Sequence, residues 1–397
     1  MSTFFCIFSH SLHETLTNIA HRAIMTKKEQ RGACQMNFIQ NKSPRVTQLL
    51  GRSHLPESSA TYEKALQGRR VLVTGGGGSI GQELCRRVAQ CHPAELIILD
   101  IYENGAYEIQ QELTHKYGSS LPLCVLIASI RDRDRIDAIF ATHRPEIVLH
   151  AAAHKHVPLM DENPAEAIKN NVFGTRNVFD AAEKHGTDKC ILISTDKAVN
   201  PSSVMGASKQ MCERMLAACV DSNTTFAAVR FGNVADSNGS VMPLFRRQIA
   251  EGGPVTVTDK RATRYFMSIA EACHLVLQAT SMAEGGEVFV LDMGEPVNIY
   301  DLACALIRDA GLIPEKDIKI KEIGLRAGEK LTEELQTSTE KLLPTAHERI
   351  FVEKAPPISK IVVRESLKVL AIALAREGNA DIVKEALQIA IPTYMPK

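Results

Sequence analysis

The chain has 397 residues, and its 46 basic and 46 acidic side chains give a formal net charge of zero. This length suits two domains, and the balanced charge without a dense basic run argues against nucleic acid as a partner. The 10 cysteines occur without a CxxC pair or a zinc-ligand pattern. We therefore expect reduced thiols in a cytoplasmic protein and no metal site. No stretch approaches the ~18 consecutive apolar residues of a membrane span, so we expect no integral membrane segment.

The first 66 residues have weak hydrophobic periodicity and mixed polarity. Their short apolar patch has no basic residues before it and no clear small-residue cleavage site, which disfavours a signal peptide. We therefore predict an N-terminal extension over residues 1–66 that is partly disordered.

A glycine-rich turn follows the first strong apolar run, in the sequence VLVTGGGGSIG at residues 71–81. Glycines allow a tight turn and the close approach of a pyrophosphate, and the helix that follows presents unpaired N–H groups to that anion. The residues expected to meet the cofactor are Gly75, Gly78, Ser79, Ile80 and Gly81. About 20 residues on, Asp100 ends a second apolar run, where a carboxylate accepts hydrogen bonds from ribose hydroxyls. The pattern predicts a dinucleotide site that favours NAD over NADP.

Apolar strands and helices then alternate along the chain. The predicted strands after the first are residues 96–100, 122–128, 146–150, 189–194 and 225–230. The predicted helices are residues 82–89, 103–116, 132–142, 165–185 and 205–220. Such alternation predicts an α/β fold, a doubly wound parallel sheet with helices on both faces, which is the Rossmann arrangement. We assign this domain to residues 67–235.

Ligands of such a sheet bind at the carboxyl ends of its strands, so the segments after the strands are candidates for the site. The fourth strand is followed by His150, three alanines and the sequence HKH. Small side chains at Ala151, Ala152 and Ala153 let the backbone approach a cofactor. A metal site would need more ligands than these histidines.

The fifth strand leads into Thr195, Asp196 and Lys197, which places an acid beside a base. Met205 and Lys209 share one face of the next predicted helix because they are four residues apart. Both side chains can point into one cleft, although a core methionine and a solvated lysine fit the same spacing. The spacing alone leaves both interpretations open.

From residue 236 the alternation becomes irregular, and we assign residues 236–397 to a smaller α/β domain with some interleaving of segments. Its predicted strands are residues 255–257 and 288–291, and its predicted helices are residues 242–251, 302–309, 365–376 and 380–391. Loop arginines such as Arg264 and Arg326 suit a diphosphate group through bidentate contacts, although surface charge explains each one equally well.

Six motifs follow one another along residues 45–397: TGGGGSIG, HAAAHKHVPLMDENPAEAIKNNVFGT, STDKAVNPSSVMGASK, RFGNVADSNGSV, TRYFMS and GLRAGEKLTEEL. Together they resemble the extended short-chain dehydrogenase/reductase superfamily. Within it, the chain is similar to the polysaccharide-biosynthesis (CapD-like) UDP-N-acetylglucosamine 4,6-dehydratase group that carries methionine in place of the catalytic tyrosine. Many members have membrane helices before this region, so the chain looks like a soluble short form.

The resemblance implies a lyase that uses tightly bound NAD to convert UDP-N-acetylglucosamine into a UDP-4-keto-6-deoxy sugar for surface glycan synthesis. It implies Lys197 as the base at sugar C5 and Asp196 as the acid for the departing 6-hydroxyl. It places Thr195 near O4 and Lys209 on the nicotinamide ribose. Met205 cannot take a proton, so the O4 proton goes to Asp196 or to water.

The resemblance also implies binding residues in both domains. The cofactor residues, besides the glycine turn, Asp100 and Lys209, are Ala151, Ala152, Ala153 and Asn171. The substrate residues are His154, Lys155, Asn233, Ser240, Val241, Arg264, Arg326 and Glu329. Ser129 stands where relatives often have aspartate, which leaves the adenine contact open. The second domain is therefore expected to bind the nucleotide sugar.

Two other functions compete with this one. A UDP-sugar 4-epimerase normally has a tyrosine base, so Met205 and the neighbouring acid–base pair argue against it. A catalytically inactive NAD-binding scaffold would explain the missing tyrosine, but the intact acid, base and Lys209 argue against that. By analogy of fold, the helices at 103–116 and 165–185 are candidate surfaces for a homo-oligomer. The resemblance favours retention of configuration at C5.

Overall fold

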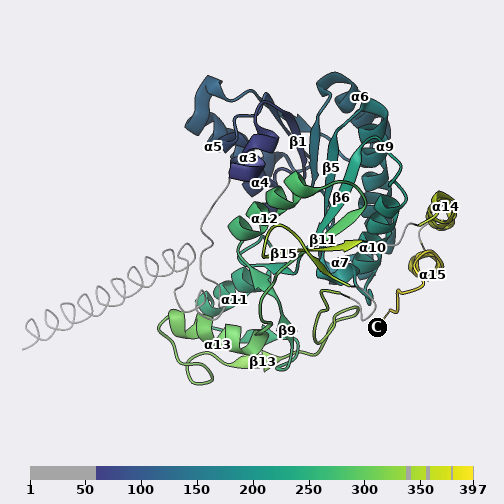
Figure 1. Ribbon diagram of the computed structural model, residues 1–397. Helices are drawn as coiled ribbons and strands as arrows, with labels where there is room; N and C mark the ends of the chain where they lie inside the picture. Colours follow the sequence, from purple (N-terminus) through teal and green to yellow (C-terminus); the bar gives the residue numbers. More distant parts are fainter. Residues whose placement is uncertain (1–59, 337–340, 355–357, 377–378, 397) are drawn as a thin grey trace, which may run out of the picture.

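The computed structural model describes residues 60–336, 341–354, 358–376 and 379–396, so the prediction for residues 1–59 lies outside the described residues. This part of the chain contains a large central sheet (Figure 1). Its strands are β1 (Arg70–Thr74), β2 (Glu95–Asp100), β3 (Leu123–Ile127), β4 (Ile147–His150), β5 (Lys189–Ile193), β6 (Thr225–Arg230), β11 (Glu287–Leu291), β14 (Leu343–Pro344) and β15 (Ile350–Lys354). Their spatial order is β14-β15-β11-β6-β5-β4-β1-β2-β3.

Strands β1 to β6 and β11 run parallel, and β15 and β14 extend the sheet in antiparallel fashion. The order β3-β2-β1-β4-β5-β6 is that of a Rossmann fold, which confirms the predicted doubly wound sheet. The strand order reverses between β1 and β4, whose last residues Thr74 and His150 are partners in the register. Ligands of such folds bind at this point.

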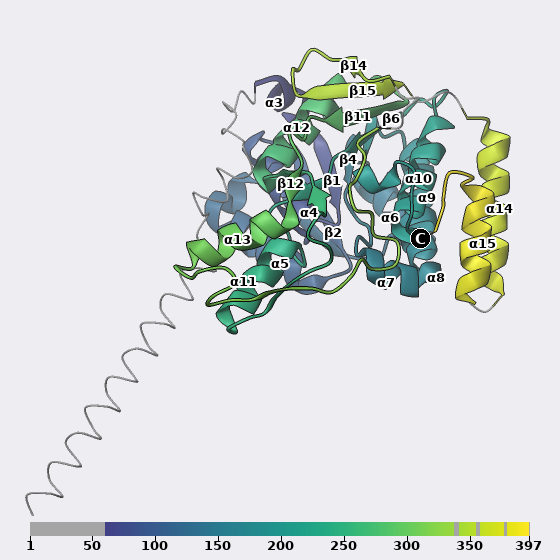
Figure 2. The ribbon, with the colours of Figure 1, turned by 90° about the horizontal axis from the view of Figure 1, so that it is seen from below.

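Helices cover both faces of the sheet (Figures 1 and 2). One face carries α3 (Ala60–Leu66), α4 (Ser79–Gln90), α5 (Glu103–Tyr117) and α12 (Ile269–Met282). The other carries α6 (Arg133–His143), α9 (Thr175–His185) and α10 (Val204–Ala217), with the hairpin of α14 (Lys360–Ala375) and α15 (Ala380–Ala390) outside α10. Side chains alternate along β1, so Leu72 joins one core while Val71 and Val73 join the other. No helix among the described residues is long and apolar enough to cross a membrane.

The helix predicted at 165–185 is interrupted. It starts as α8 (Pro164–Ala167), continues as a π-helical segment (Ile168–Gly174) and becomes regular in α9. Gly174, the last residue of the π-helical segment, packs closely against Ile130, since a Cβ there would lie 2.7 Å from side-chain atoms of Ile130. A short helix that the sequence did not predict, α7 (Val157–Glu162), precedes it. π-Helical turns often occur at functional sites.

A second, smaller core is built by residues from 235–266 and 297–320. Its helices are α11 (Val241–Ala250) and α13 (Ile299–Asp309). Its short strands, and those that join it to the large domain, are β7 (Asn233–Val234), β8 (Val255–Val257), β9 (Thr263–Arg264), β10 (Phe266–Met267), β12 (Val297–Asn298) and β13 (Ile320–Glu322).

The predicted domain boundaries need two corrections. The block 236–397 does not form one domain, because α12, β11, β15, α14 and α15 return to the large sheet or to its helices. The interleaving is thus extensive. Helix α12 escaped prediction because its middle is buried on all sides and shows no amphipathic period. The extension predicted over 1–66 also overlaps the first domain, since Tyr62 and Leu66 of α3 are buried in its core.

Candidate active site

The glycine turn after β1 is built for close backbone contact. Gly75 has a φ of +68°, and a Cβ on this residue would lie 2.7 Å from the backbone nitrogen of Ala152. A Cβ on Gly81 would lie 2.0 Å from the carbonyl oxygen of Gly75. Gly78 is the N-cap of α4 and brings no side chain to the helix end. The glycines therefore let the turn pack against the Ala152 backbone and lead into α4, and the pyrophosphate is predicted at the N-terminus of this helix.

Asp100, at the end of β2, ties two turns together. Its Oδ2 accepts a hydrogen bond from the Gly77 N–H at 2.8 Å, and its Oδ1 accepts one from the Tyr102 N–H at 2.8 Å. Gly77 in turn lies directly against Gly105, where a Cβ would be 2.5 Å from the Gly77 carbonyl oxygen. Each Asp100 oxygen keeps accepting capacity for a ribose hydroxyl, which fits the predicted role.

The loop after β4 is braced from the π-helical segment. The Asn171 side chain accepts a hydrogen bond from the His154 N–H at 2.8 Å and donates to the His154 carbonyl at 3.0 Å and to Ser208 Oγ at 2.9 Å. Ala151 to Ala153 are half-buried, and His154 and Lys155 are exposed. Asn171 thus holds the shape of the predicted cofactor loop, and its own contact with a cofactor stays a prediction.

The acid–base pair lies in a short turn (Asp196–Ala198) directly after β5. Lys197 Nζ donates to Asp196 Oδ1 at 2.9 Å and to Asn233 Oδ1 at 3.2 Å, and Thr195 Oγ1 donates to the same Asp196 oxygen at 2.9 Å. Gly206 lets α10 start against this turn, since a Cβ there would lie 2.2 Å from the Lys197 carbonyl oxygen. The structure thus brings together three predicted catalytic residues and one predicted substrate residue.

Glu333, which the sequence analysis missed, completes this cluster. Its Oε1 lies 3.8 Å from Lys197 Nζ and 4.0 Å from Arg264 Nε, and only 4% of its side chain is exposed. It reaches the cluster because the Thr263 N–H donates to the Leu331 carbonyl at 3.0 Å, which aligns its segment with β9. The last sequence motif has two adjacent acids, Glu333 and Glu334, before its final leucine, and an extended chain sends neighbouring side chains to opposite sides. That signal was available, but it does not tell which acid points inward.

A lysine that acts as a base must be a neutral amine, but the surroundings of Lys197 favour its charged form. Burial lowers the pKa of Lys197, but the nearby Asp196 and Glu333 carboxylates outweigh burial, and the pKa is raised. Arg264, the nearby cation, opposes this rise only weakly. Burial also raises the pKa of Glu333. Lys197 is therefore an ammonium ion in this arrangement, and its use as a base requires the loss of one proton.

Lys209 and Met205 lie on the first turns of α10. Lys209 Nζ donates to the carbonyl of Ile193, the last residue of β5, at 2.6 Å, and burial lowers its pKa. Met205 is only 3% exposed and packs in the large core. The structure therefore favours the interpretation of Met205 as a core residue, whereas Lys209 reaches the carboxyl end of the sheet rather than solvent.

Some side chains that were predicted to bind the diphosphate already make hydrogen bonds within the protein. The Arg264 guanidinium donates to Glu329 Oε1 at 2.9 Å and to three backbone carbonyls, including that of Lys330 at 2.8 Å. Arg264 and Glu329 thus lock their segments together, and Arg326 is the exposed residue of the three. Diphosphate binding by Arg264 would require it to give up some of these contacts.

The loop before α11 offers another anion position. Ser240 is the N-cap of α11, which starts at Val241, and its buried Oγ has no hydrogen-bond partner among the described residues. The Asn238 N–H donates to Ser79 Oγ at 3.0 Å, so this loop touches the start of α4. The predicted cofactor turn and the predicted substrate loop are therefore neighbours.

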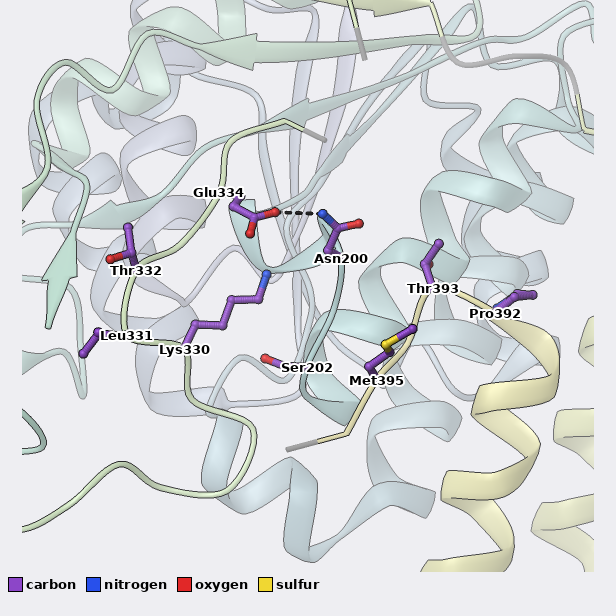
Figure 3. Close-up of a pocket in the computed structure, with 9 residues that line it drawn as sticks. All are labelled: Asn200, Ser202, Lys330, Leu331, Thr332, Glu334, Pro392, Thr393 and Met395. Carbon is purple, nitrogen blue, oxygen red and sulfur yellow. Dashed lines mark hydrogen bonds between the residues drawn. The ribbon is translucent and has the colours of Figure 1, made fainter. Parts of the chain in front are cut away.

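Two further features lie apart from the cluster. Within the described residues, the one group of potential metal ligands close enough to share an ion is Glu95, Cys124 and His143, at the opposite end of the strands. A cavity of about 600 Å³ lies beside the segment that carries Glu333 (Figure 3). Its lining consists of Asn200, Ser202, Lys330, Leu331, Thr332, Glu334, Pro392, Thr393 and Met395. None of these lining residues was predicted to touch substrate or cofactor.

Comparison with known proteins identifies the family of the chain. The pattern of a family described as "Polysaccharide biosynthesis protein" matches residues 71–355. The chain is 50% identical over 312 residues to the capsular polysaccharide biosynthesis protein CapD of Staphylococcus aureus, covering 78% of this chain and 52% of that protein. The chain thus spans about half the length of this curated relative.

Enzymes with a named reaction are more distant. The chain is 34% identical over 304 residues to a UDP-N-acetylglucosamine 4,6-dehydratase (inverting) of Campylobacter jejuni, covering 75% of this chain and 86% of that one. It is 36% identical over 277 residues to a UDP-glucose 4-epimerase of Rickettsia canadensis, covering 68% and 78%. Among solved structures, it is similar to Pen from Bacillus thuringiensis, with a TM-score of 0.69, 35% identity and coverage of 74% and 90%.

Proposed function

The chain belongs to the polysaccharide biosynthesis protein family, and we propose that it is a nucleotide-sugar 4,6-dehydratase acting on UDP-N-acetylglucosamine. The observation that carries this proposal is the contact of Asp196 with Lys197 at the carboxyl end of β5. Elimination of water across C5 and C6 needs such an acid and base side by side. The likeness to the Campylobacter dehydratase supports the same reaction.

NAD is the proposed cofactor, held by the glycine turn, Asp100 and Lys209. The glycine turn leads into the N-terminus of α4, whose N–H groups suit a pyrophosphate, and Asp100 fits a free ribose because its charge repels a 2′-phosphate. When bound, NAD would supply a hydride acceptor for oxidation at sugar C4 and a hydride donor for reduction at C6. Purified protein should contain NAD or bind it more tightly than NADP, and a clear preference for NADP would contradict the role of Asp100.

The proposed proton transfers use two residues. Asp196 takes the O4 proton as C4 is oxidised and passes it to the departing 6-hydroxyl, so that it ends the turnover ionised as it began. Lys197, as the neutral amine, takes the C5 proton and returns a proton to C5 after water has left. Return to the same face retains configuration at C5, and return to the other face inverts it.

Substrate binding is proposed for the loop before α11, which contacts the start of α4. The N-terminus of α11 with Ser240 and Val241 would hold the diphosphate, because its N–H groups and the unpartnered hydroxyl of Ser240 suit an anion. Exposed Arg326, His154 and Lys155 add positive or hydrogen-bonding side chains.

The reaction is tested by incubating the full-length protein with UDP-N-acetylglucosamine in D₂O and following the product by NMR. We expect a 4-keto-6-deoxy sugar with deuterium at C5, and the coupling constants of H5 report retention or inversion. A C4 epimer would instead establish the epimerase, for which the Rickettsia relative is the precedent. Unchanged substrate with NAD bound would favour an inactive scaffold.

We also propose that the protein is cytoplasmic and self-associates. The cysteines of the described residues are all free, and most are buried, which suits a reducing compartment. Exposed Ile101, Tyr102 and Tyr107 lie just before and on α5, one of the two helices predicted to form an oligomer interface. Light scattering with size-exclusion chromatography tests the proposed self-association, and a monomer at micromolar concentration would contradict it.

A further inference from the structure

Buried and half-buried charges of alternating sign connect the two domains at the site. Asp196 and Lys197 come from the large domain, and their contact measures 2.9 Å. Glu333 follows at 3.8 Å from Lys197, Arg264 at 4.0 Å from Glu333, and Glu329 at 2.9 Å from Arg264. Glu333 is therefore the link between the catalytic lysine and the second domain.

The carboxylate of Glu333 is incompletely hydrogen-bonded. Its Oε2 is buried without a hydrogen-bond partner among the described residues, and its Oε1 lies beyond hydrogen-bond distance of Lys197 Nζ. The charged groups that face it are Lys197, Asp196, Arg264 and Lys330, and burial is the largest influence, raising its pKa. A buried carboxyl with an unused oxygen is well placed to take up a proton.

Before the proposed reaction can begin, the Lys197 ammonium must lose one proton. The reaction begins with Lys197 as a neutral amine, yet Asp196 and Glu333 hold this residue as an ammonium ion. Asp196 is already used, since it starts as the anion that takes the O4 proton. Bulk water is a poor acceptor once a sugar fills the site. Of the groups that surround Lys197, Glu333 is the other anion within 4 Å.

We propose that Glu333 is a positioning residue that takes one proton from Lys197 and so releases the amine for the reaction at C5. A side-chain movement must first close the 3.8 Å gap between Lys197 Nζ and Glu333 Oε1 to hydrogen-bond distance. The step then breaks one N–H bond of the ammonium and forms one O–H bond on the carboxylate, so that an ion pair becomes a neutral pair. Exclusion of water by the sugar drives it, because a neutral pair loses less hydration than an ion pair. The role of the amine rests on the proposed dehydratase reaction, whereas the charge coupling does not.

Glu334 provides a matched control. It follows Glu333 directly, but its carboxylate accepts a hydrogen bond from Asn200 Nδ2 at 2.7 Å and lines the cavity rather than the cluster (Figure 3). Glu333→Gln and Glu334→Gln therefore make the same chemical change on adjacent residues, and only the first alters the surroundings of Lys197.

The coupling is measured without substrate, by trace acetylation of Lys197 with acetic anhydride at a series of pH values and quantification of the labelled peptide by mass spectrometry. Removal of an anion stabilises the neutral amine, so the labelling midpoint of Glu333→Gln should fall by about 1 pH unit or more relative to wild type. Glu334→Gln should match wild type. An unchanged midpoint in Glu333→Gln overturns the proposal, even if the enzyme proves to have another activity.

The proton transfer is measured by the pH dependence of kcat with UDP-N-acetylglucosamine. In wild type the proton stays inside the pair, so kcat should change little from about pH 6.5 to 8.5. Glu333→Gln must lose it to water, so its kcat should rise about tenfold per pH unit on the acid side. Glu333→Asp keeps an acid and should restore the flat profile at a lower rate. A loss by the same factor at every pH would reveal a purely structural role and overturn the proposal.

Folding of each variant is checked by thermal unfolding. If Glu333→Gln does not fold, Glu333→Asp carries the test, because its shorter side chain moves the carboxylate away from Lys197 and should also lower the labelling midpoint. A midpoint equal to wild type in that variant overturns the proposal. Absence of turnover in wild type would contradict the proposed reaction alone.

Discussion

Two buried groups of charges lie side by side in this protein, and neighbouring residues of the chain belong to different groups. Ser194 donates to Glu213 Oε1 at 2.6 Å, and Arg230 binds Glu213 at 2.8 Å and Glu353 at 3.3 Å. The next residue, Thr195, belongs to the Asp196–Lys197–Glu333 group instead. The Arg230 group joins β6, α10 and β15, and its arginine binds one carboxylate in fork geometry.

The two groups differ in whether their buried carboxylate oxygens have hydrogen-bond partners. In the Arg230 group both oxygens of Glu213 accept hydrogen bonds. In the Lys197 group, Asp196 Oδ2 and Glu333 Oε2 are buried without partners among the described residues. Unsatisfied buried oxygens reduce stability, so their presence at one group and not the other marks the site where a ligand is expected to complete the contacts.

The largest effect that separates the two groups is expected for Lys197→Ala. Loss of the base should reduce turnover about ten-thousandfold, a barrier increase of about 5.5 kcal/mol, and abolish deuterium incorporation at C5. Binding of the UDP-sugar, measured by calorimetry, should persist. Wild-type rates in this variant would remove Lys197 from the mechanism.

Arg230→Ala should instead lower the free energy of unfolding, by an amount comparable with the barrier increase in Lys197→Ala. It leaves Glu213 and Glu353 buried without their cation, which costs about 3–5 kcal/mol. Urea denaturation measures this loss, and activity per folded molecule should stay close to wild type. A stability change below about 1 kcal/mol would mean that the Arg230 group is not the structural one.

Asp196→Asn is expected to cost about a hundredfold in turnover, or about 2.7 kcal/mol, because the amide neither accepts the O4 proton nor donates one to the leaving hydroxyl. Glu213→Gln is its matched control, since it removes the same charge from the other group and should affect unfolding rather than kcat. Equal kinetic losses in both variants would erase the distinction between the groups.

Met205→Leu should have the smallest effect. The side chain is buried in the core and has no group that can exchange a proton, and this exchange usually costs less than about 1.5 kcal/mol of stability. We expect turnover within about tenfold of wild type. Lys209→Ala, one turn away, should lose far more through poor cofactor positioning. A thousandfold loss in a folded Met205→Leu would show that the sulfur orients the sugar or a water molecule.

The amino-acid sequence alone determined the parallel sheet, the glycine turn and the pairing of Asp196 with Lys197. These depend on local patterns: apolar runs of four to six residues, a cluster of glycines directly after one of them, and residues adjacent along the chain. The motif that contains Glu333 was also visible, although not its role. Helix α12 was missed because a helix buried on all sides has no amphipathic signal.

Only the tertiary structure decided which charges meet. Glu333 approaches Lys197 across 136 positions of sequence because its segment aligns with β9, and Arg264 turns inward to Glu329 and nearby carbonyls. Burial alone would lower the pKa of Lys197; its sequence neighbour Asp196 is the larger cause that raises it, and the long-range approach of Glu333 adds to that rise. Such long-range contacts depend on how whole elements pack, and no local pattern of charge or hydrophobicity specifies which of two adjacent acids faces the core.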